Sequence, residues 1–208
     1  MDPLDKTILA NLYSSTLDPS ISAYARLKTR LPVSQEFYNS IISRLVNVGL
    51  VEKSDPTKLT FIGRDALKVV LVGGVFDLIH PGHIHTLKAA KAVGDVLVVV
   101  VARQSTAQKI KKSRKIYHDE KLRRDLVTSL NFVDLALIGK EGTLYDTVEY
   151  VKPNVIALGY DQAHSEKDIA ENCKKLNLNV QVIRLSTPIP ESKSSKIKEE
   201  LGDSIYGI

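Results

Sequence analysis

The chain has 208 residues, of which 43% are hydrophobic and 25% are charged, and its formal net charge is +5. This is the composition of an ordinary globular protein, and the length suits one large or two small domains. The sequence contains no apolar run long enough for a membrane span and no charged-then-apolar leader, so we expect a cytoplasmic protein outside the membrane. The single cysteine, Cys173, cannot form an internal disulfide, and the mild positive charge fits a protein that handles anionic small molecules.

Residues 1–67 predict a small separate domain. Three stretches have helical periodicity, at residues 5–13, 20–30 and 34–48. Ser20 and Ser34 stand where N-caps are expected. Two short strands joined by a Ser-Asp-Pro-Thr turn follow at residues 50–53 and 58–61, and from Gly63 the chain is expected to be a linker. Three helices and a β-wing in this order resemble the winged helix-turn-helix fold.

DNA binding by this segment stays possible. The third helix would be the reading helix, and it offers Gln35, Asn39, Ser43 and Arg44, with Glu36 acting against them. Residues 1–68 contain nine Lys plus Arg against seven Asp plus Glu, whereas phosphate-dominated binding needs a clear basic stripe. Several large side chains suggest a packed surface: Tyr24, Phe37, Tyr38, Ile41, Ile42 and Leu45. We therefore expect a structural or dimerising role ahead of operator recognition, and a homodimer overall.

A strand, a glycine turn and a helix begin the second domain, residues 68–208. Residues 68–72 are β-branched and almost uncharged, which predicts a strand buried on both faces of a parallel sheet, and Gly73 and Gly74 end it. Residues 84–93 have helical spacing and stop at a glycine. Such a turn directs backbone N–H groups and the positive end of a helix dipole toward one point above the strand end. A phosphate group is the natural occupant of that point.

The sequence from Gly73 to His83, GGVFDLIHPGH, resembles the signature of the nucleotidyltransferase superfamily with the cytidylyltransferase-like fold, which carries G-x-F-D followed by H-x-G-H. The resemblance implies a nucleotide-binding set: Gly74, Val75, Phe76, Asp77, His80, Pro81, Gly82 and His83. It also implies that His80 and His83 are catalytic and donate to phosphate oxygens, while Asp77 braces the turn or, as a lesser possibility, orients a metal ion or a lysine. The alternative interpretation is that both histidines only cap a loop or a helix. A zinc-type site that adds His85 is disfavoured, because positions 83 and 85 face different sides of a helix.

The remaining elements predict a Rossmann-like α/β domain with a parallel sheet. Apolar strands are expected at residues 95–102, 132–138, 154–158 and 180–185. Helices are expected at residues 143–151 and 165–176. The strand at 95–102 is uniformly apolar, which favours an interior place in the sheet.

The stretch from residue 103 to residue 125 is densely basic. It contains Lys109, Lys111, Lys112, Arg114, Lys115, Lys121, Arg123 and Arg124. A solvated helix face and loop would explain this, but the stretch leaves the sheet at the edge where ligands bind in open α/β folds. Its K-x-Y-H followed by an arginine resembles glycerol-3-phosphate cytidylyltransferases, which implies that Lys115 and Arg123 are catalytic and hold the phosphates.

Two later phrases complete the resemblance. The phrase A-L-G-Y-D-Q at residues 157–162, with V-A-R and V-I-R-L elsewhere, resembles the archaeal FAD synthetases. It implies that Gly159 and Asp161 contact the nucleotide, Asp161 accepting from base or ribose, whereas its alternative role is the N-cap of the helix at 165–176. The serine-rich run before residue 199 resembles a phosphate-holding helix start, which implies that Ser194, Ser195 and Lys196 bind the β- and γ-phosphates. One departure is that residues 188–191 lack the arginine that cytidylyltransferases carry there.

These resemblances imply transfer of a nucleotidyl group from an NTP to a phosphorylated acceptor, with pyrophosphate leaving and Mg²⁺ bridging the phosphates. No residue is assigned as a metal ligand. FAD synthetase, which joins the AMP of ATP to FMN, is favoured over a CTP-dependent cytidylyltransferase, whose acceptor would resemble glycerol 3-phosphate. A third hypothesis is a nucleotide- or flavin-sensing regulator that binds DNA through residues 1–67.

Overall fold

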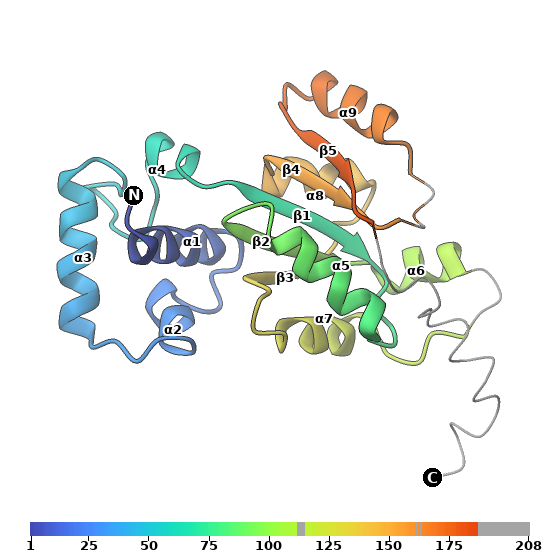
Figure 1. The fold of residues 1–208 in the computed structure, drawn as a ribbon, viewed down its shortest axis with the longest axis horizontal. Helices are drawn as coiled ribbons and strands as arrows, with labels where there is room; N and C mark the ends of the chain where they lie inside the picture. Colours follow the sequence, from blue (N-terminus) through green and yellow to red (C-terminus); the bar gives the residue numbers. More distant parts are fainter. Residues whose placement is uncertain (112–114, 161, 163, 187–208) are drawn as a thin grey trace, which may run out of the picture. The chain divides into compact units, whose positions relative to one another are not determined.

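The computed structural model describes residues 1–111, 115–160, 162 and 164–186, and its ribbon is drawn in Figure 1. The chain divides into two compact units. The first, here the N-terminal unit, comprises Met1–Val69 and Gly94–Val96, and the second, here the sheet unit, comprises Val70–Val93 and Leu97–Ile208. None of the described helices is long and apolar enough to cross a bilayer.

The N-terminal unit is helical in its described residues. Its helices are α1 (Pro3–Leu17), α2 (Ala23–Lys28), α3 (Gln35–Asn47) and α4 (Phe61–Asp65). Ser34 caps α3 as predicted, with its hydroxyl accepting from Phe37 N at 3.1 Å. The prediction for α2 was wrong, because Ser22 and not Ser20 accepts from the first turn, at Ala25 N. The hydroxyl of Ser20 instead donates to the carboxylate of Asp18 at 2.6 Å.

The predicted β-wing is reduced to one antiparallel bridge between Val51 and Leu59. The strand predicted to reach Phe61 ends earlier because Thr60 starts α4, its hydroxyl accepting from Gly63 N at 3.0 Å. Gly63 is therefore not a linker residue. A Cβ atom added to it would lie 1.9 Å from the Leu50 carbonyl oxygen, so the close approach of these two backbones requires glycine.

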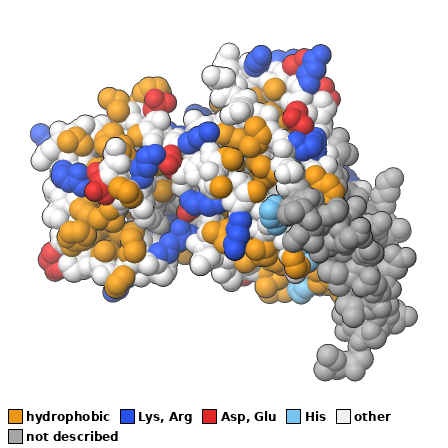
Figure 2. Space-filling view, in the orientation of Figure 1, with side chains coloured by type: hydrophobic (Ala, Val, Ile, Leu, Met, Phe, Trp, Pro, Cys, Tyr) orange, Lys and Arg blue, Asp and Glu red, His pale blue; other side chains and the backbone are white. Residues whose placement is uncertain are grey.

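Hydrophobic side chains also reach the surface of the N-terminal unit, as Figure 2 shows. Phe61 is 85% exposed and Ile62 is 65% exposed, both on α4. Phe37 of α3 is exposed as well, which corrects the expectation that it is packed. By contrast, Tyr38 is buried, and its burial raises the pKa of its hydroxyl to about 12.

The sheet has five parallel strands. They are β1 (Val69–Gly74), β2 (Val96–Val101), β3 (Leu135–Ile138), β4 (Val155–Leu158) and β5 (Gln181–Arg184). Their order is β3-β2-β1-β4-β5, so β1 is central and β2 lies between β3 and β1, as expected of a uniformly apolar strand. The chain moves from β1 to one side of the sheet and then returns to the other side at β4. The gap between β1 and β4 is thus the topological switch point, where open α/β sheets bind ligands.

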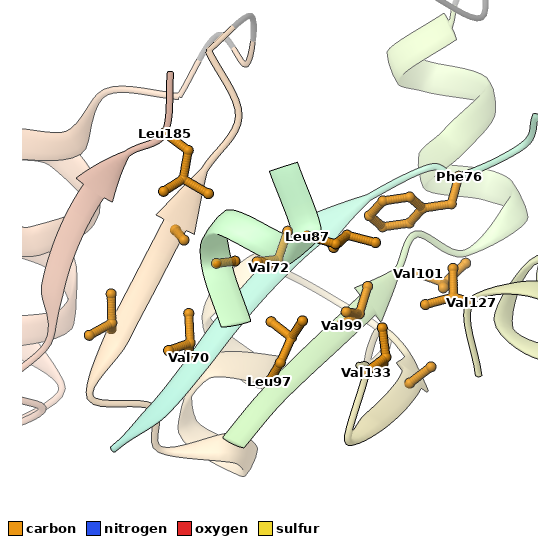
Figure 3. Packing of buried hydrophobic residues seen from close by; sticks show 14 residues of the cluster. Val70, Val72, Phe76, Leu87, Leu97, Val99, Val101, Val127, Val133 and Leu185 are labelled. Carbon is orange, nitrogen blue, oxygen red and sulfur yellow. The ribbon is translucent and has the colours of Figure 1, made fainter. Parts of the chain in front are cut away.

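Helices connect the strands of the sheet. They are α5 (Pro81–Lys91), α6 (Gln104–Lys111), α7 (Glu120–Thr128), α8 (Leu144–Val151) and α9 (Glu166–Lys175). Figure 3 shows Val70 and Val72 of β1 and Val99 of β2 gathered with Leu87 of α5 in one core cluster. Every second side chain of a strand points to the same face of the sheet, so Val70 and Val72 pack on one face together with Leu87, which is fully buried. This packing holds α5 against the sheet and so fixes where the helix begins.

Candidate active site

The turn after β1 has a backbone that few sequences can adopt. Phe76 has a φ of +52°, in the left-handed region that costs a residue with a side chain about 1 kcal/mol. Its ring is buried over Gly74, where an added Cβ atom would lie 2.7 Å from two ring carbons. Gly74 is therefore required by the close approach of Phe76. The two residues together shape the turn that leads to α5.

Two histidines stand together at the start of α5. His80 is the N-cap residue, but its side chain makes no capping hydrogen bond, and Pro81 occupies the first turn with Gly82 beside it. The rings of His80 and His83 stack with centroids 3.9 Å apart, and the ring of Phe76 lies 5.2 Å from that of His83. The capping interpretation of His80 is thereby not supported. The pair stays at a helix N-terminus, where the dipole favours anions.

Asp77 braces the turn against the segment that follows α6. Its carboxylate is 3% exposed, and its Oδ1 accepts from the backbone N–H groups of Tyr117 at 2.9 Å and of His118 at 3.0 Å. The imidazole Nδ1 of His118 lies 2.9 Å from the Asp77 carbonyl oxygen. The turn after β1 and the segment between α6 and α7, 40 residues apart in sequence, are thus joined by one side chain.

Arg123 is buried, and its guanidinium bonds to groups of the protein itself, which favours a supporting role over the predicted direct contact to phosphate. Its side chain is fully enclosed on α7 and donates to three backbone carbonyls and one side chain. The acceptors are Val75 O at 2.7 Å, Ala102 O at 2.9 Å, His118 O at 3.0 Å and Gln104 Oε1 at 3.3 Å. Desolvation lowers the pKa of this guanidinium, while the nearby carboxylate of Asp77 acts in the opposite direction. Because the Arg123 guanidinium donates to carbonyls from three separate segments, it holds their backbone in place.

Lys115 is exposed, two residues before the Tyr117 N–H that Asp77 binds, and its Nζ lies 5.7 Å from the centre of the Tyr117 ring. The contact between Lys115 and phosphate remains a prediction. Other predicted residues lie outside the described part of the chain: Lys112, Arg114, Asp161, Ser194, Ser195 and Lys196. The alternative role of Asp161 as an N-cap is filled by Ser165, whose hydroxyl accepts from Asp168 N at 3.2 Å.

Sequence reasoning missed the role of Gln162, which is the last residue of the phrase A-L-G-Y-D-Q. Its side-chain amide joins two backbone groups, accepting from Gly159 N at 3.1 Å and donating to Gly73 O at 2.7 Å. Arg184 of β5 adds bonds to the carbonyl oxygens of Gly159 and Gln162, each at 2.9 Å. The only signal in the sequence was the phrase that contains Gln162.

The described residues hold no group of three or more His, Cys, Asp or Glu side chains arranged as a metal site. Asp77 is the carboxylate of the turn, and it is occupied by backbone N–H groups. These residues therefore do not fit a metal ion held by the protein alone.

A parallel sheet with a glycine turn, a helix N-terminus and a histidine pair at its switch point is the arrangement of a nucleotide-binding α/β enzyme. The chain belongs to the cytidylyltransferase-like family, whose model matches residues 71–200, and it is a nucleotidyltransferase. The matched range covers every site residue named above and begins one residue after the sheet unit begins.

Individual relatives add detail to the family match. The chain is 48% identical over 116 residues to the FAD synthase of Aciduliprofundum boonei, which covers 56% of this chain and 76% of the relative. It is 44% identical over 140 residues to the FAD synthase of Thermoplasma volcanium, which covers 64% of this chain and 96% of the relative. A solved structure described as the lipopolysaccharide core biosynthesis protein from Thermoplasma volcanium is also 44% identical. It has a TM-score of 0.56 and covers 58% of this chain and 98% of its own.

Proposed function

We propose that this nucleotidyltransferase is an FAD synthase, which transfers the adenylyl group of ATP to FMN. Identity of 48% and 44% to archaeal proteins named FAD synthase is the observation that carries the choice of substrates. The histidine pair at the start of α5, beside the switch point, supports the type of reaction. Residues 188–191 also lack the arginine of the cytidylyltransferases, and the apolar character of residues 187–190 suits a flavin ring.

The reaction is an in-line displacement at the α-phosphorus of ATP. A phosphate oxygen of FMN forms the new bond, the bond from the α-phosphorus to the bridging oxygen breaks, and pyrophosphate leaves with that electron pair. Such a reaction needs alignment and neutralisation of charge more than a protein nucleophile. We assign His80 and His83 as hydrogen-bond donors to the α- and β-phosphate oxygens, with the backbone from Gly74 to Phe76 and from Pro81 to Gly82 alongside the phosphates.

Lys115 is the proposed contact to the transferring and leaving phosphates. Arg123 and Asp77 act one layer behind the phosphates, because both use their polar atoms on backbone groups of the turn and of residues 117–118. Mg²⁺ would arrive bound to the triphosphate of ATP, since the described residues do not form a protein-only site for it. Asp161, Ser194, Ser195 and Lys196 remain proposed nucleotide contacts through the family resemblance.

The test is pyrophosphate release and product chromatography over a grid of ATP or CTP with FMN or glycerol 3-phosphate, each with and without Mg²⁺. We expect FAD and pyrophosphate from ATP, FMN and Mg²⁺, with CTP poor. CDP-glycerol formation without detectable FAD would overturn the FAD assignment and establish the cytidylyltransferase alternative, which the sequence K-x-Y-H at residues 115–118 favours. An acceptor from lipopolysaccharide core synthesis belongs in the same grid, because the solved relative carries that description.

The N-terminal unit is proposed to be a winged-helix-like module with a structural or dimerising role. Arg44, one of the candidate base-reading residues, is paired with Asp5 of α1 through both terminal guanidinium nitrogens. Gln35 donates to Asn39 at 2.9 Å, so these amides also bond to each other. A gel shift with genomic fragments, with and without ATP or FMN, tests the regulator hypothesis, and sedimentation tests the homodimer. Sequence-specific, ligand-dependent binding would establish the regulatory role.

A further inference from the structure

Pairing between the two central strands changes at the switch point. β1 and β4 are paired at Val70 with Val155 and at Leu71 with Ile156. Two places further along, this register sets Gly73 opposite Leu158. The carbonyl of Gly74 points to the β2 side, where it accepts from Ala102 N at 2.8 Å, so the alternation of a strand turns the Gly73 carbonyl toward β4. In a continued parallel ladder, that carbonyl would accept from the N–H of the residue after Leu158, which is Gly159.

The side chain of Gln162 stands between these two groups. Its Oε1 accepts from Gly159 N at 3.1 Å, and its Nε2 donates to Gly73 O at 2.7 Å. The orientation of the amide is determined by its partners, because an N–H group can bond only to the oxygen end and a carbonyl only to the nitrogen end. One amide group therefore replaces one direct strand-to-strand hydrogen bond. Both backbone groups stay satisfied while the strand ends are held apart.

A second side chain keeps Gln162 in place. Arg184 of β5 donates from Nη1 to the carbonyl oxygens of Gly159 and Gln162, each at 2.9 Å, and from Nη2 to His164 O at 2.7 Å. Its Nε also bonds to Glu166 at 2.9 Å. The backbone before α9 is thus tied to β5, and the Gln162 side chain can reach back across β4 to β1.

We propose that Gln162 is a positioning residue that holds open the crevice between the ends of β1 and β4, where the nucleotide enters the sheet edge. Gly73 immediately precedes the turn at Gly74–Phe76, so the same amide sets the distance between the phosphate turn and the segment after β4. The proposal rests on the proposed function only in taking an NTP as the ligand. It adds a residue that acts through the backbone and not through contact with the reacting atoms.

The test compares two substitutions of Gln162 with a matched control. Gln162→Met keeps the length of the side chain and removes both hydrogen bonds, whereas Gln162→Asn keeps the amide but is too short to join both groups. Gln181→Met makes the same chemical change at an exposed side chain on β5. We expect the KM for ATP to rise about tenfold in both Gln162 variants, because part of the binding free energy must then be used to separate the strand ends. The kcat should change less than about threefold, and Gln181→Met should match the wild type.

Nucleotide affinity is also measured by calorimetry with ATP and with CTP, in the absence of an acceptor. Weaker binding by both Gln162 variants, with a melting temperature close to that of the wild type, would support the proposal. Unchanged affinity in both variants, or a loss that Gln181→Met shares, would overturn it. A wild-type protein that binds ATP but makes no FAD would refute the FAD assignment and leave the role of Gln162 standing.

Discussion

The two units use polar side chains in different ways. In the sheet unit, Asp77, Arg123 and Gln162 each bond to backbone groups of connecting segments or strand ends and hold neighbouring segments in place. In the N-terminal unit, ion pairs join side chains to one another, either at the surface, as between Lys58 and Asp55, or at a buried carboxylate, as between Arg44 and Asp5. Apart from Gly94–Val96, the residues 71–200 that the family model matches all lie in the sheet unit. Side chains that hold backbone segments in place mark the binding site of the sheet unit. Ion pairs between exposed side chains, by contrast, add little stability.

The largest effect is expected at the histidine pair. His83→Ala should lower kcat by about 100- to 1000-fold, because removing one preorganised donor to a developing charge has this magnitude. His80→Ala should be nearly as severe. Both variants should keep the wild-type melting temperature, and His85→Ala is the control for a histidine of the same helix. Nearly full activity in a folded His83→Ala variant would remove the pair from the mechanism.

The next largest effect is expected at Arg123, and it should appear in stability as well as activity. Arg123→Met leaves three buried carbonyl oxygens without their donor and should lower the free energy of unfolding by about 3–5 kcal/mol. Denaturant titration measures the change. Arg124→Met is the matched control, because Arg124 lies on the same helix but its side chain is 41% exposed and pairs with Asp125 at 2.7 Å. Equal stability of the two variants would contradict the positioning role.

Removing the N-terminal unit should affect catalysis much less. The FAD synthase of Thermoplasma volcanium matches this chain over 96% of its own length, so little of that relative is left to correspond to residues 1–67. A protein starting at Lys68 should keep kcat/KM within about threefold of the full chain, since domains carry their own cores. The start must lie beyond α4, because a cut at 61–64 would divide that helix.

One control belongs to this deletion. Asp95 pairs with Lys6 at 2.9 Å and also accepts from Lys68 N, so the shortened protein loses the Lys6 partner. Lys6→Ala in the full chain separates this loss from that of the unit as a whole. Complete inactivity of a folded protein starting at Lys68, with Lys6→Ala fully active, would show that the N-terminal unit completes the site.

The smallest expected effect is a pH dependence in the N-terminal unit. Hydrogen bonds from Thr57 and Lys58 lower the pKa of Asp55 to about 2. A carboxyl group with a lowered pKa in the folded state contributes stability above its unfolded pKa of 3.8, and this contribution is lost as the pH falls toward 2. Asp55→Asn should therefore reduce the drop in melting temperature between about pH 5 and 2. Calorimetry of both proteins at several pH values measures it, and parallel curves would contradict the assignment.

Local signals in the sequence predicted the five strands of the sheet, most helices and the histidine pair, but not the loss of the two wing strands. Ser34 caps α3 as expected because a cap depends on a hydroxyl within one helical turn, and Gly74 marks the turn because only glycine fits below Phe76. The stacked arrangement of His80 and His83 also follows from local spacing, since residues three apart share one face of a helix. These features need no information from distant parts of the chain.

Tertiary structure alone decided what Arg123 and Gln162 do. The sequence shows Arg123 in a basic stretch, which favours solvent or phosphate, but packing of α7 encloses it among carbonyls from Val75 and Ala102. The sequence shows Gln162 only as the last residue of a motif, whereas the sheet order places β1 beside β4 and brings Gly73 within reach of its amide. Both roles depend on contacts between residues far apart in sequence, and no propensity or spacing rule encodes which distant backbone groups a polar side chain will meet.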